Sequence, residues 1–198
     1  MITGMNFNHQ FDEVDFDDRE LEVLNFLSSE QNAYFTFQGL RRRLGLHQET
    51  LTRTLKRLEE ANAIERSSEG YRIRAGSNDS FSFSVRTNQS FKQVIDAYLP
   101  AEIDVTFLYE RLKGRWFSNF RWLGHSHDGQ ELSMSWINED GQMQLQAHVT
   151  KGKITIGIGS TGALTETPRI AAAYQLFEHI SKATEEIVQS HNSQAVAN

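Results

Sequence analysis

Basic side chains are concentrated in one stretch of this sequence, where their charge could attract phosphate groups. Residues 31–74 carry nine basic and five acidic side chains, a net charge of +4, whereas residues 1–30 carry one and eight, a net charge of −7. Residues 75–198 carry ten and thirteen, a net charge of −3. Attraction to phosphates acts over roughly 8–10 Å, so local charge matters more than the total of −6. The sequence therefore predicts a nucleic-acid contact within residues 31–74.

The stretch 47–61 combines a hydrophobic stripe with a polar face. At 100° per residue, Leu51, Leu55 and Leu58 fall on one side of a helix, which predicts that this side is buried. The opposite face holds polar and charged side chains, and two further residues lie on one flank: Glu49, Thr52, Arg53 and Lys56, then Thr50 and Arg57.

The polar face of this predicted helix has the side chains that read base edges in duplex DNA. Arg53 can donate two hydrogen bonds to guanine, while Thr52 and Gln48 can hydrogen-bond several bases. Other cations nearby would neutralise phosphates, which positions a protein without reading sequence. The predicted DNA-binding residues are Arg41, Arg42, Arg43, Gln48, Glu49, Thr50, Thr52, Arg53, Lys56, Arg57, Arg66, Ser68 and Arg72.

The elements around these residues have to hold the polar face outward. A first helix is expected to begin near Asp17 or Asp18, where carboxylates favour the helix N-terminus. A second helix is expected from about Thr36 to the break at Gly45, before the helix over 47–61. Alternating residues on either side of 67–70 predict a β-hairpin over 64–74.

The stretch 44–64 closely resembles the winged-helix regulators of bacteria and archaea, such as the MarR and ArsR families. In those families a recognition helix of the form T-hydrophobic-S/T-R-x-L-x-x-L precedes an acidic pair, a short turn and the wing. Here residues 50–58 read Thr-Leu-Thr-Arg-Thr-Leu-Lys-Arg-Leu. The resemblance covers roughly residues 18–75 and implies duplex DNA binding, with the wing, including Arg66 and Arg72, along the backbone or minor groove. Many relatives have Ser or Thr where this chain has His47, so either His47 caps imperfectly or the helix begins one residue later.

The region beyond residue 76 has a mixed pattern of helices and strands. Alternation of Phe81, Phe83 and Val85 predicts a strand, and the spacing within 91–98 predicts a helix ending before Pro100. A short helix (103–113), four strands joined by turn glycines (115–124, 131–138, 142–150, 153–159) and a long helix (168–190) follow. The fold class is therefore α+β, an N-terminal winged helix-turn-helix and a C-terminal antiparallel sheet with a long C-terminal helix. Its element order is similar to half of the TATA-binding-protein fold and to helix-grip folds.

Other side chains that could do chemistry have simpler explanations. His125, His127 and Asp128 could bind a metal but fall near a predicted turn, where polar residues are common. Gly157, Gly159 and Gly162 lack the lysine and spacing of a phosphate-binding loop. The aromatic residues Trp116, Phe120 and Trp122 share a strand parity, for which core packing is the simplest account, with a pocket, a partner surface or single-stranded nucleic acid as alternatives.

Taken together, these patterns predict a sequence-specific, double-stranded DNA-binding transcription regulator. The chain has no cysteine and no nucleophile–base pair or metal set at useful spacing, so we expect no enzyme activity, no cofactor and no metal. We also expect a cytoplasmic homodimer without a membrane segment, whose C-terminal domain dimerises or binds a small-molecule effector or a protein of the transcription machinery. Two alternatives stay open: a sequence-tolerant architectural DNA-binding protein, and a winged helix used for protein contact. The expected domains are an acidic arm (1–16), the winged helix-turn-helix (17–76) and the α+β domain (77–198).

Overall fold

The computed structural model describes residues 15–30, 32–74, 91–100, 103–129, 131–160 and 166–196, with side chains of the last helix described up to residue 189. We call residues 15–74 the winged-helix unit and residues 91–196 the C-terminal unit. The winged-helix unit consists of α1 (Asp18–Ser29), β1 (Tyr34–Phe35), α2 (Phe37–Leu44), α3 (Gln48–Glu60), β2 (Ile64–Ser67) and β3 (Gly70–Ile73). The C-terminal unit consists of β4 (Lys92–Tyr98), α5 (Val105–Leu112), β5 (Phe120–His127), β6 (Leu132–Asn138), β7 (Met143–Thr150), β8 (Lys153–Ser160) and α6 (Glu166–Val196).

Capping residues set where the helices of the winged-helix unit begin and end. The Asp17 side chain accepts a hydrogen bond from the Glu20 N–H, and the Glu20 carboxylate accepts one from the Asp17 N–H, both at 2.9 Å. Thr36 caps α2, which ends at Gly45 in a left-handed conformation (φ 62°). His47 precedes α3 but makes no capping hydrogen bond with its side chain. The predicted helix starts are confirmed, and α3 begins one residue after His47.

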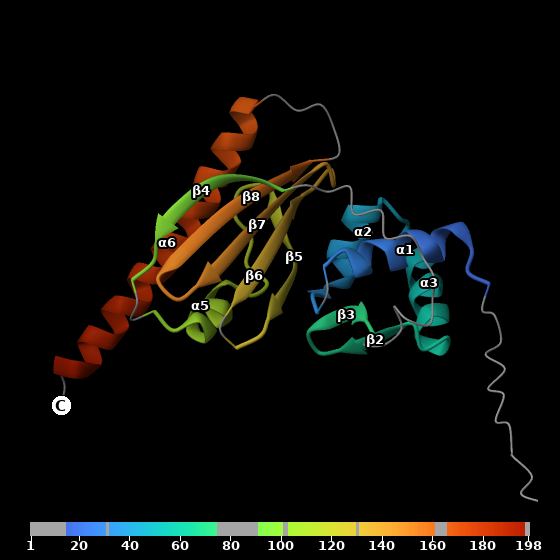
Figure 1. The fold of residues 1–198 in the computed structure, drawn as a ribbon, viewed down its shortest axis with the longest axis horizontal. Helices are drawn as coiled ribbons and strands as arrows, with labels where there is room; N and C mark the ends of the chain where they lie inside the picture. The colour runs from blue at the N-terminus through green and yellow to red at the C-terminus, as the bar shows by residue number, and fades with distance from the viewer. Residues whose placement is uncertain are drawn as a thin grey trace, which may run out of the picture.

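The strands form one antiparallel sheet that runs through both units. Its strand order is β2-β3-β1-β5-β6-β7-β8-β4, and β5 to β8 are the predicted meander (Figure 1). The short strand β1 pairs on one side with β3, through Phe35 and Tyr71, and on the other side with β5, through Tyr34 and His125. The hairpin of β2 and β3, which we call the wing, is therefore an extension of the C-terminal sheet.

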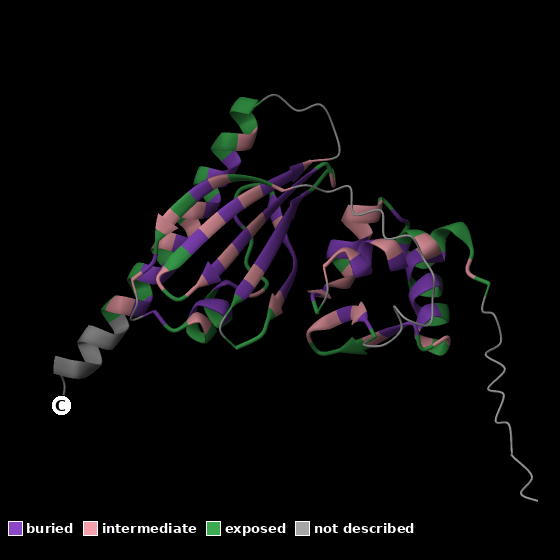
Figure 2. Cartoon of the chain, in the orientation of Figure 1, coloured by how far each residue is buried: buried purple, intermediate pink, exposed green. Residues whose placement is uncertain are grey.

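The molecule has two hydrophobic cores, one in the C-terminal unit and one in the winged-helix unit, and Figure 2 shows buried residues in both. One core packs α5 and α6 against one face of the sheet. The other fills the winged-helix unit and includes Leu123 of β5 and Ile137 of β6, both fully buried. A Cβ at Gly39 would lie 2.7 Å from Leu123, and one at Gly124 would lie 2.1 Å from the Tyr34 carbonyl oxygen. The two units therefore pack too closely at this junction for larger residues.

The predicted helix over 91–98 is wrong, because residues 92–98 form strand β4, paired with β8. The pairing register shifts between Gln93 and Ile95, which marks a β-bulge. A bulge breaks the two-residue alternation of a strand, so the apolar residues Val94, Ile95 and Tyr98 fall at spacings typical of a helix.

The remaining elements of the C-terminal unit follow the predictions, with one further correction. The short helix, the four strands and the long helix are confirmed, although β5 begins at Phe120 and not near 115. Gly114 and Ser118 have positive φ (70° and 48°), so the chain turns before β5 and Trp116 has no place in the strand. Trp116 is 65% exposed, whereas Phe120 and Trp122 are buried, so core packing is wrong for Trp116 only.

Two predictions fall wholly or partly on parts of the chain that the structure does not describe. The strand expected at Phe81, Phe83 and Val85 lies outside the described residues, as does most of the expected acidic arm. Within the described residues, no helix is both long enough and apolar enough to cross a bilayer.

Candidate nucleic-acid interface

A groove of about 890 Å³ runs along the polar face of α3, and we call it the α3 groove. The opposite face of α3 is packed into the core, which holds the helix in place. On that face Leu51, Leu55 and Leu58 are at most 2% exposed. The groove is lined by the end of α2, the turn that follows and the first half of α3: Arg41, Leu46, His47, Gln48, Glu49, Thr50, Thr52, Arg53 and Lys56. It thus brings together seven of the thirteen predicted DNA-binding residues. Leu46 and His47 were missed, and their position in the turn just before α3 was the available signal.

The side chains that line the groove include hydrogen-bonding groups that the fold itself does not use. Arg53 is exposed and makes no hydrogen bond or ion pair with any described residue. The Thr52 hydroxyl donates to the Gln48 carbonyl oxygen at 2.8 Å, which leaves its oxygen able to accept from a base. Lys56 lies 3.7 Å from Glu60, and both side chains are largely exposed, so this pair is weak.

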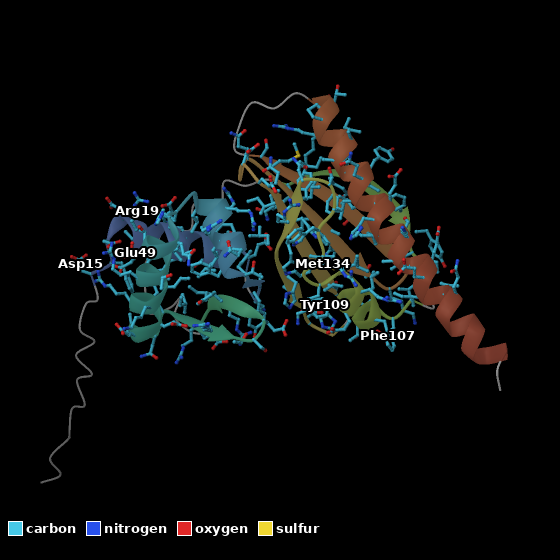
Figure 3. The ribbon with its side chains drawn as sticks, turned by 180° about the vertical axis from the view of Figure 1, so that it is seen from behind. Asp15, Arg19, Glu49, Phe107, Tyr109 and Met134 are labelled. Atoms are coloured by element: carbon cyan, nitrogen blue, oxygen red, sulfur yellow. The ribbon has the colours of Figure 1, made fainter. Side chains whose placement is uncertain are left out.

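Among the described residues that line the groove, Glu49 has the one carboxylate, in the first turn of α3 (Figure 3). A negative charge is favourable at a helix N-terminus, which explains its position without any ligand. In contact with DNA, the same carboxylate could accept a hydrogen bond from the cytosine amino group but would repel phosphates. Glu49 therefore fits a base contact better than a backbone contact.

Three of the other predicted cations contact groups within the protein. The Arg43 guanidinium lies over the Phe26 ring, 5.3 Å from its centroid, and burial lowers its pKa. The Arg42 guanidinium donates a hydrogen bond to the Gln38 carbonyl oxygen at 3.3 Å, and burial lowers its pKa, with Arg41 and Arg121 acting in the same direction. Arg57 pairs with Glu20 at 3.0 Å, where the Glu20 side chain is only 1% exposed.

The wing residues form a second group, separate from the residues that line the α3 groove. Arg66 is exposed, with its guanidinium 5.6 Å from the Tyr71 ring centroid, and Ser68 is exposed in the turn. Arg72 pairs with Glu65 across the hairpin and lies over the Tyr34 ring, 4.7 Å from its centroid. Of the three predicted wing contacts, Arg66 and Ser68 are the more accessible.

The other candidate sites have structural explanations. His125 and His127 belong to strand β5, and His125 is 7% exposed. Within the described ranges, no three His, Cys, Asp or Glu side chains are grouped to hold a metal. Gly157 and Gly159 lie in β8 and pair with residues of β7, whereas Gly162 lies outside the described residues.

Comparison with known proteins agrees with this geometry. An outward polar recognition helix, a buried stripe and a hairpin wing define a winged-helix unit, and residues 14–72 match the model of the MarR family. This match supports a winged-helix transcription regulator in general terms. It covers less than a third of the chain and does not extend into the C-terminal unit. No curated protein and no solved structure matches this chain.

Proposed function

We propose that this chain is a sequence-specific regulator of transcription that inserts α3 into the major groove of double-stranded DNA. The observation that carries the proposal is the α3 groove, in which Arg41, Arg53 and Lys56 surround hydrogen-bonding side chains on an exposed helix face. A helix of this kind fits the major groove, whose base edges carry a unique pattern of donors and acceptors.

The residues of the interface divide into base contacts and phosphate contacts. Arg53, Gln48, Glu49 and Thr52 are assigned to bases, because they line the α3 groove and offer donors and acceptors that match base edges. Phosphate contacts and wing contacts along the backbone or minor groove are assigned to Arg41, Thr50, Lys56, Arg66 and Ser68. We assign Arg42, Arg43, Arg57 and Arg72 mainly a structural role, with a phosphate contact as a secondary role.

The full operator requires two copies of the chain in this proposal. One helix-turn-helix subunit reads one half-site, and most such proteins bind two half-sites as symmetric dimers. The C-terminal unit is the part available for dimerisation, for a small-molecule effector or for a protein of the transcription machinery. Its exposed aromatic side chains, Tyr98, Phe107, Trp116 and Tyr174, are candidates for such contacts.

Selection of bound sequences from a random duplex pool at physiological salt tests this proposal. We expect an enriched inverted repeat, with half-sites one helical turn or a multiple of it apart. Salt-sensitive binding with no enriched sequence would contradict sequence reading and favour an architectural protein. Absence of binding would contradict the proposal altogether and favour a winged helix that contacts a protein.

A further inference from the structure

The turn of the wing is bonded to the C-terminal unit through a single carboxylate. Glu69, in the turn between β2 and β3, accepts a hydrogen bond from the Tyr109 hydroxyl at 2.6 Å and one from the Lys113 ammonium group at 2.7 Å. Tyr109 lies on α5 (Figure 3), and Lys113 directly follows that helix. These residues are 40 and 44 positions from Glu69 in the sequence, so the contact joins distant parts of the chain.

A buried histidine extends this set of contacts into the sheet. The His125 Nε2 atom lies 3.0 Å from the Tyr109 hydroxyl oxygen. A hydroxyl group has one proton, and here it is donated to Glu69, so His125 must donate from Nε2. Its Nδ1 is then unprotonated, and it is buried without a hydrogen-bond partner among the described residues. Burial lowers the pKa of His125 to about 4, which keeps the ring neutral and fits this arrangement.

The charge of Glu69 makes these bonds stronger than ordinary hydrogen bonds. Lys113 and Tyr109, as hydrogen-bond donors, lower the pKa of Glu69, so it is ionised at neutral pH. Hydrogen bonds to a charged group are shorter and stronger than those between neutral groups. The Lys113 ammonium also lies 5.2 Å from the Tyr109 ring centroid. Each partner of Glu69 is therefore held by more than one contact.

The strands of the wing are held by the winged-helix core, in which Ile64, Tyr71 and Ile73 are buried. Among the described residues, β2 is the edge strand of the sheet, and β3 pairs with β1 only through Tyr71 and Phe35. A two-stranded hairpin is at best marginally stable by itself. The bonds of Glu69 add an attachment at the turn, so the wing is held both along its strands and at its turn.

We propose that Glu69, Tyr109, Lys113 and His125 form a latch that fixes the wing on the C-terminal unit and so positions it for DNA. This inference rests on the proposed function, because the wing is assigned a DNA contact there. The latch residues are positioning residues: they set where Arg66 and Ser68 lie relative to α3. The C-terminal unit thereby controls the geometry of the DNA-binding surface.

Amide hydrogen exchange of the full chain without DNA tests the latch directly. Tyr109→Phe removes the hydroxyl without changing the charge, and Glu69→Gln removes the carboxylate charge. In both variants we expect the amides of residues 66–72 to exchange about tenfold faster, with those of α3 unchanged. Glu110→Gln is the matched control, because Glu110 is exposed beside Tyr109 and is outside the latch. Wing exchange equal to that of the wild type in both latch variants would overturn the proposal.

The affinity for a selected duplex tests whether the latch matters for DNA. Tyr109→Phe should weaken binding severalfold, because the wing must then be ordered on binding. Faster wing exchange with unchanged affinity would overturn the positioning role. A wild-type chain that binds no duplex would contradict the proposed function, and the exchange data would still decide whether the latch exists.

Discussion

Two arginines on α3 show how differently neighbouring cations are used. Arg53 and Arg57 are one helical turn apart, but Arg53 lines the α3 groove and Arg57 contacts α1. The Arg57 guanidinium pairs with Glu20, whose carboxylate also accepts the Asp17 N–H of the α1 cap. Arg57 therefore connects α3 to the start of α1.

Replacing Arg57 is expected to destabilise the fold more than replacing its neighbour Lys56. Arg57→Ala leaves a buried carboxylate with one partner fewer, which costs about 1–3 kcal/mol, and the exposure of Arg57 favours the lower end. Lys56→Ala removes a weak exposed pair and should cost at most about 0.5 kcal/mol. The free energy of unfolding in urea measures both changes, and equal losses would contradict a structural role for Arg57.

The sequence predicted which side of α3 is exposed, but not which of the basic side chains contact other groups of the protein. The leucine stripe at 51, 55 and 58 is sufficient to orient the helix, because it depends on local spacing only. The partners of Arg43, Arg57 and Arg72 come from α1 or from the opposite strand, and local spacing does not reveal these contacts. The Glu69 latch was not predicted for the same reason, since its partners follow Glu69 by 40 or more residues.

At the scale of elements, the sequence predicts those with a regular pattern and fails where a distant pairing decides. The turn glycines Gly129, Gly141 and Gly152 have φ of 93°, 71° and 81°, and they mark the meander correctly. Strand β4 was mistaken for a helix because its bulge hides the strand period. The two-residue strand β1 is too short to carry a period, although it joins the wing to the C-terminal sheet.

The contact between α1 and β7 depends on a carboxyl group with a shifted pKa. Glu30 follows α1, and its carboxyl oxygen accepts a hydrogen bond from the Gln146 side-chain amide at 3.2 Å. Burial raises the pKa of Glu30 from 4.5 to about 7. The folded chain thus keeps a proton on Glu30 at pH values where the unfolded chain has lost it.

Replacing Glu30 by Gln should stabilise the protein increasingly as the pH rises. Between pH 4.5 and 7 folding takes up a proton at Glu30, so this group lowers the stability of the wild type with rising pH. Gln cannot ionise, and the variant should gain at most about 3 kcal/mol over the wild type by pH 8. Urea unfolding at pH 5 and pH 8 measures the gain. Glu178→Gln, an exposed substitution on α6, is the control, and a gain independent of pH would contradict this account.

At the scale of the whole molecule, the winged-helix unit and the C-terminal unit are joined by a shared sheet. β1 lies between the wing and β5, and Leu123 of β5 and Ile137 of β6 belong to the winged-helix core. The expected domain boundary after residue 76 falls outside the described residues and stays a prediction. Strands that are far apart in the sequence pair across the two units, and local spacing does not reveal such pairs. The sequence therefore predicted two domains but not the sheet that they share. A change in the C-terminal unit can consequently reach the wing through β5 and α5.

Base reading by α3 is tested by the affinity of Arg53→Ala for a selected duplex and for a scrambled one. Lys153→Ala, which removes one exposed positive charge from β8, is the control at the same salt concentration. Arg53→Ala should lose about 1–3 kcal/mol of binding free energy on the selected duplex and much less on the scrambled one, and Lys153→Ala should bind both as the wild type does. Equal losses of Arg53→Ala on the two duplexes, or no loss, would contradict base reading by α3.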